Sequence, residues 1–240
     1  AGISIPLDSR ITQTAHHGGL SGIDRRMTYP IVRDVDVVTD TQARTDNAQP
    51  VTDPGGQQVN VYFVNGTGGG DGTRSNPYDL AAAEAASGTG DAFMLLFEAG
   101  NGAIFGTITL KGRQQLWGAG DTGEQTLTLG TRNVRLKLTG LGNRETLTSL
   151  GPADIVTLAN ANVLQGFNIA AGLCAVRGNS ITGLTVRDLN VTGSGEGIEL
   201  TDVAGSVSIS DCTLQCPQWG IRVLNAGATD DELALSLTGN

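Results

Sequence analysis

Residues 184–191 read Leu-Thr-Val-Arg-Asp-Leu-Asn-Val, and residues 207–214, 23 positions later, read Val-Ser-Ile-Ser-Asp-Cys-Thr-Leu. The apolar positions coincide, and the coincidence continues beyond these two segments. The matched pairs are Leu184/Val207, Val186/Ile209, Leu189/Cys212, Val191/Leu214, Gly197/Gly220, Ile198/Ile221 and Leu200/Val223. Two-residue alternation that is interrupted by Gly, Asn and Asp and recurs at a fixed step predicts short strands stacked in successive coils.

The preceding segment carries the same pattern with a small shift. Leu164, Phe167 and Ile169 lie 22 residues before Val186, Leu189 and Val191, and we align Cys174 and Val176 with Ile198 and Leu200, 24 residues later. Each strand of such a coil pairs with its equivalent in the next coil, so equivalent residues stack about 4.8 Å apart. The sequence therefore predicts an all-β, single-stranded right-handed parallel β-helix.

Composition narrows the possible partners. The chain has 240 residues, of which 39% are hydrophobic and 4% aromatic, and its 35 glycines suit many tight bends. A net charge of −9 argues against nucleic acid as a partner, because phosphate binding needs clustered basic side chains. No apolar run reaches the length of a membrane-spanning helix, so we expect no transmembrane helix.

The chain divides, by pattern, near residue 57. Residues 1–57 are expected to form an extended leader and linker with two short strands, at 3–7 and 35–37, and residues 58–240 to form the β-helix. Further predicted elements are a capping helix at 80–86, begun by Asn76 and ended by Gly88, and strands at 59–64, 93–97, 104–110, 115–117, 127–129 and 134–138. Residues 233–237 repeat 207–209 at a step of about 26, and we expect a solenoid that is truncated at its C-terminal end or closed there by a partner.

The first predicted coil resembles that of pectin-lyase-like β-helix proteins. The resemblance rests on Val-Tyr-Phe-Val-Asn-Gly at 61–66, Asp-Gly-Thr-Arg-Ser-Asn-Pro-Tyr at 71–78, the Ala-rich helix, and the segments 107–111 and 116–120. It implies the β-helix fold for residues 59–240. It leaves activity open, because polysaccharide lyases, hydrolases, phage tailspikes and adhesin passengers share this fold.

The leader is similar to a different family. Residues 22–38, Gly-Ile-Asp-Arg-Arg-Met-Thr-Tyr-Pro-Ile-Val-Arg-Asp-Val-Asp-Val-Val, resemble the closing segment of inverse-autotransporter barrels of the intimin and invasin type. This resemblance implies that the β-helix is an exported passenger at the outer membrane or cell surface of a Gram-negative bacterium.

Asp188 and Asp211 are the first candidate site. They lie 23 residues apart, so the repeat stacks them at one bend of the coil. Two carboxylates stacked about 5 Å apart in adjacent coils suit a bridging calcium ion or the acid pair of a retaining glycosidase. The alternative is that both are solvated residues at a turn position that favours Asp.

Two further candidates come from the next strand of the repeat. Glu199 stacks under Arg222, which predicts a salt bridge between coils, and only a full set of calcium-binding acids would make Arg222 a lyase base. Trp219 is a candidate sugar-stacking platform or a lid over the edge of the coil. Cys174 and Cys212 are expected at inward positions as small hydrophobes, with Cys216 in a bend. We expect all three thiols to be free, and the alternative is a Cys212–Cys216 or other disulfide.

These observations favour a structural role. We expect an exported, adhesin-like β-helix scaffold. Its partner is a second copy of itself or a surface or extracellular partner, including polysaccharide. We expect no cofactor, with bound calcium as the alternative. The alternative is a carbohydrate-active enzyme, either a polysaccharide lyase or a glycoside hydrolase, or a tailspike-like polysaccharide-binding domain.

Overall fold

The computed structural model describes residues 60–66, 69–88, 92–96, 103–122, 124–129, 132–137, 144–225 and 233–240. The chain divides into two units, Ala1–Asn47 and Ala48–Asn240, and every described residue belongs to the second. The two strands predicted in the leader lie outside the described residues. Within the described part, no helix has the length and apolar character needed to cross a membrane.

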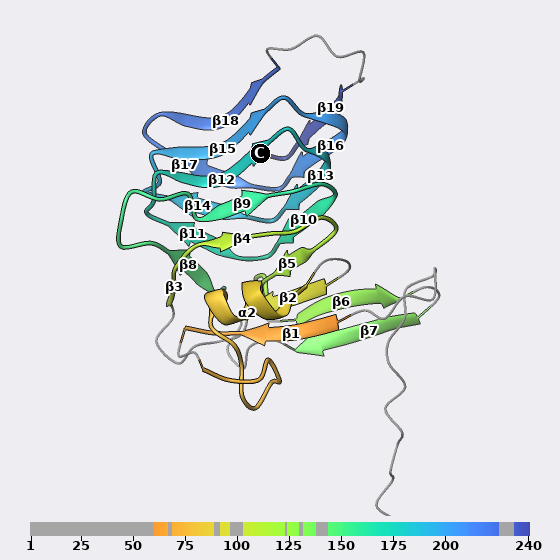
Figure 1. Ribbon diagram of the computed structural model, residues 1–240. Helices are drawn as coiled ribbons and strands as arrows, with labels where there is room; N and C mark the ends of the chain where they lie inside the picture. Colours follow the sequence, from red (N-terminus) through yellow and green to blue (C-terminus); the bar gives the residue numbers. More distant parts are fainter. Residues whose placement is uncertain are drawn as a thin grey trace, which may run out of the picture. The chain divides into compact units, whose positions relative to one another are not determined.

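Most described strands belong to three parallel sheets, which the chain visits in turn (Figure 1). Sheet 1 contains β1 (Asn60–Val64), β2 (Ala92–Leu96), β5 (Gln115–Trp117), β10 (Asn162–Gln165), β13 (Thr182–Arg187), β16 (Ala204–Ser210) and β19 (Leu233–Thr238). Sheet 2 contains β3 (Ala103–Phe105), β8 (Thr146–Thr148), β11 (Asn168–Ala170), β14 (Asn190–Thr192) and β17 (Thr213–Gln215). Sheet 3 contains β4 (Ile108–Thr109), β9 (Val156–Leu158), β12 (Cys174–Asn179), β15 (Glu196–Thr201) and β18 (Trp219–Leu224). The predicted right-handed parallel β-helix is confirmed.

The core consists of columns of apolar side chains that run from coil to coil. In sheet 1 the register gives the column Leu116, Leu164, Val186, Ile209 and Leu237. The first four are fully buried, whereas Leu237 at the end of the column is 51% exposed. Each coil therefore buries its apolar face against its neighbours, as expected of a solenoid.

Two steps of the predicted register are wrong, each by two residues. Cys174 pairs with Glu196 and Val176 with Ile198, so the step is 22 and not 24. Leu235 pairs with Val207, so the last step is 28 and not 26. Because side chains alternate between the two faces of a strand, a shift of two residues preserves the apolar pattern, and the pattern alone does not distinguish the two alignments.

The step of 23 arises from one irregular place. Thr182 pairs with Ala204, 22 residues on, but Leu184 pairs with Val207, and the register shifts between these two pairs. One extra residue is thus inserted in β16, where Gly205 adopts a positive φ of 69°. The pairs Leu184/Val207, Val186/Ile209, Val191/Leu214 and Ile198/Ile221 are confirmed at the predicted step.

A helix covers the beginning of the coil, as predicted. Helix α2 (Leu80–Ala86) buries Leu80 and Ala83 in the core. Its cap is Asp79, whose side chain accepts a hydrogen bond of 2.6 Å from the Ala82 N–H, and the prediction that Asn76 caps the helix is wrong. The Glu84 side chain accepts a hydrogen bond of 2.9 Å from the Thr109 N–H of β4, the edge strand of sheet 3 in the first coil. The helix thus satisfies a backbone group at a sheet edge.

Two predicted strands lie outside the parallel coil. Strands β6 (Glu124–Leu129) and β7 (Arg132–Lys137) form an antiparallel hairpin inserted between β5 and β8. Gln125 Oε1 of this hairpin accepts a 3.0 Å hydrogen bond from Gln165 of sheet 1. The strand predicted at 104–110 is two strands, β3 and β4, because the chain bends from sheet 2 to sheet 3 at Gly106, whose φ is 133°.

Candidate functional site

Charged side chains stack on the outer face of sheet 3. The register places Arg177 under Glu199 and Glu199 under Arg222, and in the neighbouring column it places Cys174 under Glu196 and Glu196 under Trp219. Ile198 and Leu200, which flank Glu199 along β15, belong to the core. Glu199 therefore points outward, but its side chain is only 10% exposed because basic neighbours cover it on both sides.

Arg177 lies at the centre of this arrangement. Its Nε lies 2.7 Å from Asp154 Oδ2 and its Nη2 lies 3.2 Å from Glu196 Oε2, while its Nη1 contacts Glu199 Oε2. Arg222 Nη1 lies 3.7 Å from Glu199 Oε1, which confirms the predicted ion pair between coils. We call Asp154, Cys174, Arg177, Glu196, Glu199 and Arg222 the sheet-3 cluster.

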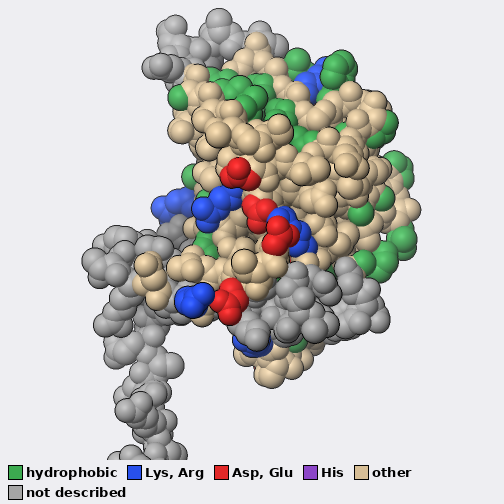
Figure 2. Space-filling model, turned by 180° about the vertical axis from the view of Figure 1, so that it is seen from behind, with side chains coloured by type: hydrophobic (Ala, Val, Ile, Leu, Met, Phe, Trp, Pro, Cys, Tyr) green, Lys and Arg blue, Asp and Glu red, His purple; other side chains and the backbone are tan. Residues whose placement is uncertain are grey.

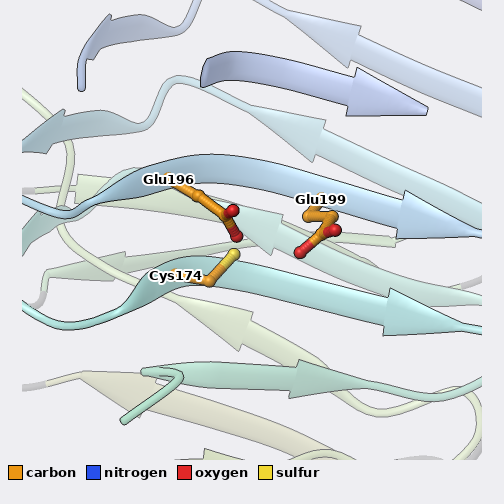
Figure 3. Close-up of side chains that lie close together, drawn as sticks. All are labelled: Cys174, Glu196 and Glu199. Atoms are coloured by element: carbon orange, nitrogen blue, oxygen red, sulfur yellow. The ribbon is translucent and has the colours of Figure 1, made fainter. Parts of the chain in front are cut away.

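Three members of the sheet-3 cluster converge at one point (Figure 3). One ligand atom from each of Cys174, Glu196 and Glu199 lies within 4.8 Å of the others. Burial raises the pKa of the Cys174 thiol to about 11. Burial also raises the pKa of Glu196, and the hydrogen bond and charge of the adjacent Glu199 raise it further. The cluster thus keeps a protonated thiol beside two close carboxyl groups.

Sequence reasoning missed this cluster because of the register. The alignment of Cys174 with Ile198 placed the thiol in an apolar column, whereas its true neighbour in the next coil is Glu196. Cys174 is fully buried, as predicted, but its sulfur lies beside two carboxyl groups and not in an apolar column. Cys212 does lie in the core as predicted, and all three cysteines are free.

Asp188 and Asp211 occupy equivalent corners between sheets 1 and 2. Their φ values are 54° and 55°, and the register aligns them with Gly166 and Gly239, whose φ values are 75° and 68°. This left-handed conformation is strained for most side chains and is adopted most easily by Gly, Asn and Asp. The backbone of the corner therefore accounts for the residue type at both positions.

The two carboxylates have different surroundings. Asp188 Oδ1 contacts Arg144 Nη2, and Arg144 also donates to the Asp188 carbonyl at 2.7 Å and from Nε to Asp121 Oδ1 at 2.6 Å. Asp211 Oδ1 lies beside Gly239 in the following coil, 2.6 Å from the place that a Cβ would occupy there. Asp188 therefore shares one guanidinium group with Asp121.

Trp219 begins β18 and is 51% exposed. The guanidinium carbon of Arg222 lies 5.5 Å from the centre of its ring. This distance is that of a cation–π contact. About half of the Trp219 side chain still faces solvent. Trp219 thus presents a half-exposed aromatic surface.

Comparisons of this chain with protein-family models, with curated proteins and with solved structures found no match.

Proposed function

We propose that this protein is a structural β-helix scaffold that presents its outer faces to a partner, as adhesin-like passengers do. The observation that carries the proposal is the pairing of the charged candidate residues with one another. Glu199 is covered by two guanidinium groups, and Asp188 is covered by Arg144. Side chains held in this way stabilise neighbouring coils and are poorly placed to exchange protons with a substrate.

The geometry of the two aspartates supports the same proposal. A retaining glycosidase needs two carboxyl groups about 5–5.5 Å apart that face one substrate bond. Here Asp188 Oδ2 lies near Gly120, whereas Asp211 Oδ1 lies near Gly239 in a later coil. The two groups are therefore engaged at different places along the corner.

Export to the cell surface or the extracellular space is part of the proposal. Its support is the first coil, in which β1, the segment that ends at Tyr78, and α2 follow one another as the resemblance to pectin-lyase-like proteins implies. A long parallel coil with a net negative charge suits a passenger that meets other surfaces outside the cell.

Self-assembly is the second part of the proposal. β17, β18 and β19 are each the last strand of their sheet, and Leu224, Leu235 and Leu237 on this end are 39%, 41% and 51% exposed. Figure 2 shows apolar side chains gathered toward this end, and paired acidic and basic side chains further down. For the 240-residue chain, we expect a second copy of the same chain to cover this end. Light scattering over a concentration series measures this association, and a monomer at all concentrations contradicts it.

A polysaccharide degradation assay distinguishes the scaffold proposal from the alternative of a carbohydrate-active enzyme. We expect no new reducing ends and no unsaturated products when the full chain is incubated with acidic and neutral polysaccharides. Cleavage by the wild type that is lost in an Asp188→Asn, Asp211→Asn double variant refutes the scaffold proposal. An Asp202→Asn variant is the control, since Asp202 has a similar φ of 50° at another corner.

A second function, polysaccharide binding, is favoured by the exposed ring of Trp219. The chain has two tryptophans, and Trp117 is only 5% exposed, so a change of tryptophan fluorescence on adding oligosaccharide reports on Trp219. Binding predicts a saturable change that disappears in Trp219→Ala. A change that survives this substitution, or no change in the wild type, argues against a sugar platform at this position.

A further inference from the structure

The Cys174, Glu196 and Glu199 side chains form a set of close donors on sheet 3. Glu196 and Glu199 project from β15 and Cys174 from β12, and the three side chains point toward one another (Figure 3). Their ligand atoms lie within 4.8 Å of one another, and the two glutamate side chains are 14% and 10% exposed. We propose that these three residues bind one thiophilic divalent cation, and that zinc is the ion they fit best.

A buried oxygen within the cluster supports this proposal. Glu199 Oε2 is ion-paired with the Arg177 guanidinium but accepts no hydrogen bond of acceptable geometry. A buried carboxylate oxygen normally receives such a bond, and here the ion pair balances its charge without supplying one. A metal ion between the sulfur and the carboxylates satisfies this oxygen.

The donor types select the metal. Zinc accepts Cys sulfur at about 2.3 Å and Glu oxygen at about 2.0–2.2 Å, whereas calcium and magnesium take oxygen ligands. Tetrahedral bonds of these lengths place the donors roughly 3.3–3.7 Å from one another. The present spread of up to 4.8 Å closes to that range by rotation of the two flexible glutamate side chains. Three protein ligands leave the fourth position to water.

The charge of the sheet-3 cluster agrees with a bound cation. Asp154, Glu196 and Glu199 carry three negative charges against the two positive charges of Arg177 and Arg222, so one negative charge is in excess. Zinc that binds the Cys174 sulfur displaces its proton to solvent, so binding adds one net positive charge and neutralises the cluster. Arg177 keeps Asp154 as its partner when the metal engages the glutamates.

Cobalt and zinc binding to the full chain test the proposal. Because His16 and His17 are the only histidines and offer an unrelated metal site, all variants carry His16→Ala and His17→Ala. We expect one Zn²⁺ per chain by calorimetry, and an absorption band of sulfur-to-metal charge transfer when Co²⁺ is added. Cys174→Ala is expected to abolish this band and to weaken zinc binding by about 100-fold or more.

Cys212→Ala is the matched control, because Cys212 is a second buried thiol, 3% exposed, that lies near Asp188 and Asp211. It is expected to keep both the stoichiometry and the charge-transfer band. Glu199→Gln, which preserves shape, is expected to weaken zinc binding while the circular dichroism spectrum stays that of the wild type. The proposal is overturned if the parent chain gives no sulfur-to-cobalt band, or if Cys174→Ala and Cys212→Ala bind zinc equally.

Discussion

Removing one side chain from the sheet 1 column tests how the coils stabilise one another. Leu164 and Leu237 belong to the same column, but Leu164 is fully buried between Leu116 and Val186, whereas Leu237 is 51% exposed at its end. Leu→Ala removes three carbons, and at about 0.8 kcal/mol each the lost transfer free energy is about 2.4 kcal/mol for Leu164. The coils on both sides keep a cavity from collapsing, and about 24 cal/mol per Å³ of residual cavity brings the expected loss to about 4 kcal/mol.

The same substitution at Leu237 should cost much less. About half of this side chain already faces water, and its removal opens no closed cavity, so we expect a loss of about 1 kcal/mol. Urea unfolding followed by circular dichroism measures both variants, with Leu150→Ala, 93% exposed, as a control near zero. Equal losses for Leu164 and Leu237 at low protein concentration refute the stacked-column description. If the loss of unfolding free energy caused by Leu237→Ala grows with protein concentration, a second copy of the chain covers the end of the coil at β19.

Three further substitutions address the helix cap, the corner and the sheet-3 cluster. Asp79→Ala should lower the free energy of unfolding by about 1 kcal/mol, because the Ala82 N–H loses its acceptor, and urea unfolding measures this loss. Asp211→Val should cost about 1–2 kcal/mol in the same assay and Asp211→Gly much less, since φ at this corner is 55°. Glu196→Gln, with a chelator present, should raise the midpoint of thermal unfolding at neutral pH. The Glu196 pKa is raised above 4.5, so folding favours its protonated form, and the advantage of the variant should vanish as the pH falls below that value. An equal effect of this variant at every pH contradicts this assignment.

The sequence was sufficient for the parts of the fold that repeat. Alternation of apolar residues at a fixed step requires parallel stacking, and the buried pair Leu189 and Cys212 confirms that these positions share the core. The capping helix was predictable from its Ala-rich composition. Its N-cap was not, because Asn76 and Asp79 are both good caps, and the backbone bridge between Thr73 and Asn76 places Asn76 in a turn before the helix.

The stacking of Asp188 and Asp211 was also predictable, but their surroundings were not. Arg144 lies 44 residues before Asp188, after an inserted hairpin that has no counterpart in the described part of the other coils. A repeat pattern contains no information about such an insertion. The ion pair between Arg144 and Asp188 could therefore not be predicted from the repeat.

The register errors explain why the sheet-3 cluster escaped sequence reasoning. A slip of two residues leaves every inward side chain inward, so the core is nearly indifferent to it. The contacts of Cys174 do change, because the same slip replaces Glu196 by Ile198 as its neighbour in the next coil. Turn length alone decides which polar residues meet on the outside of this coil. The apolar columns hold the coils together, and the lengths of the turns determine whether a thiol and two carboxylates come within reach of one metal ion.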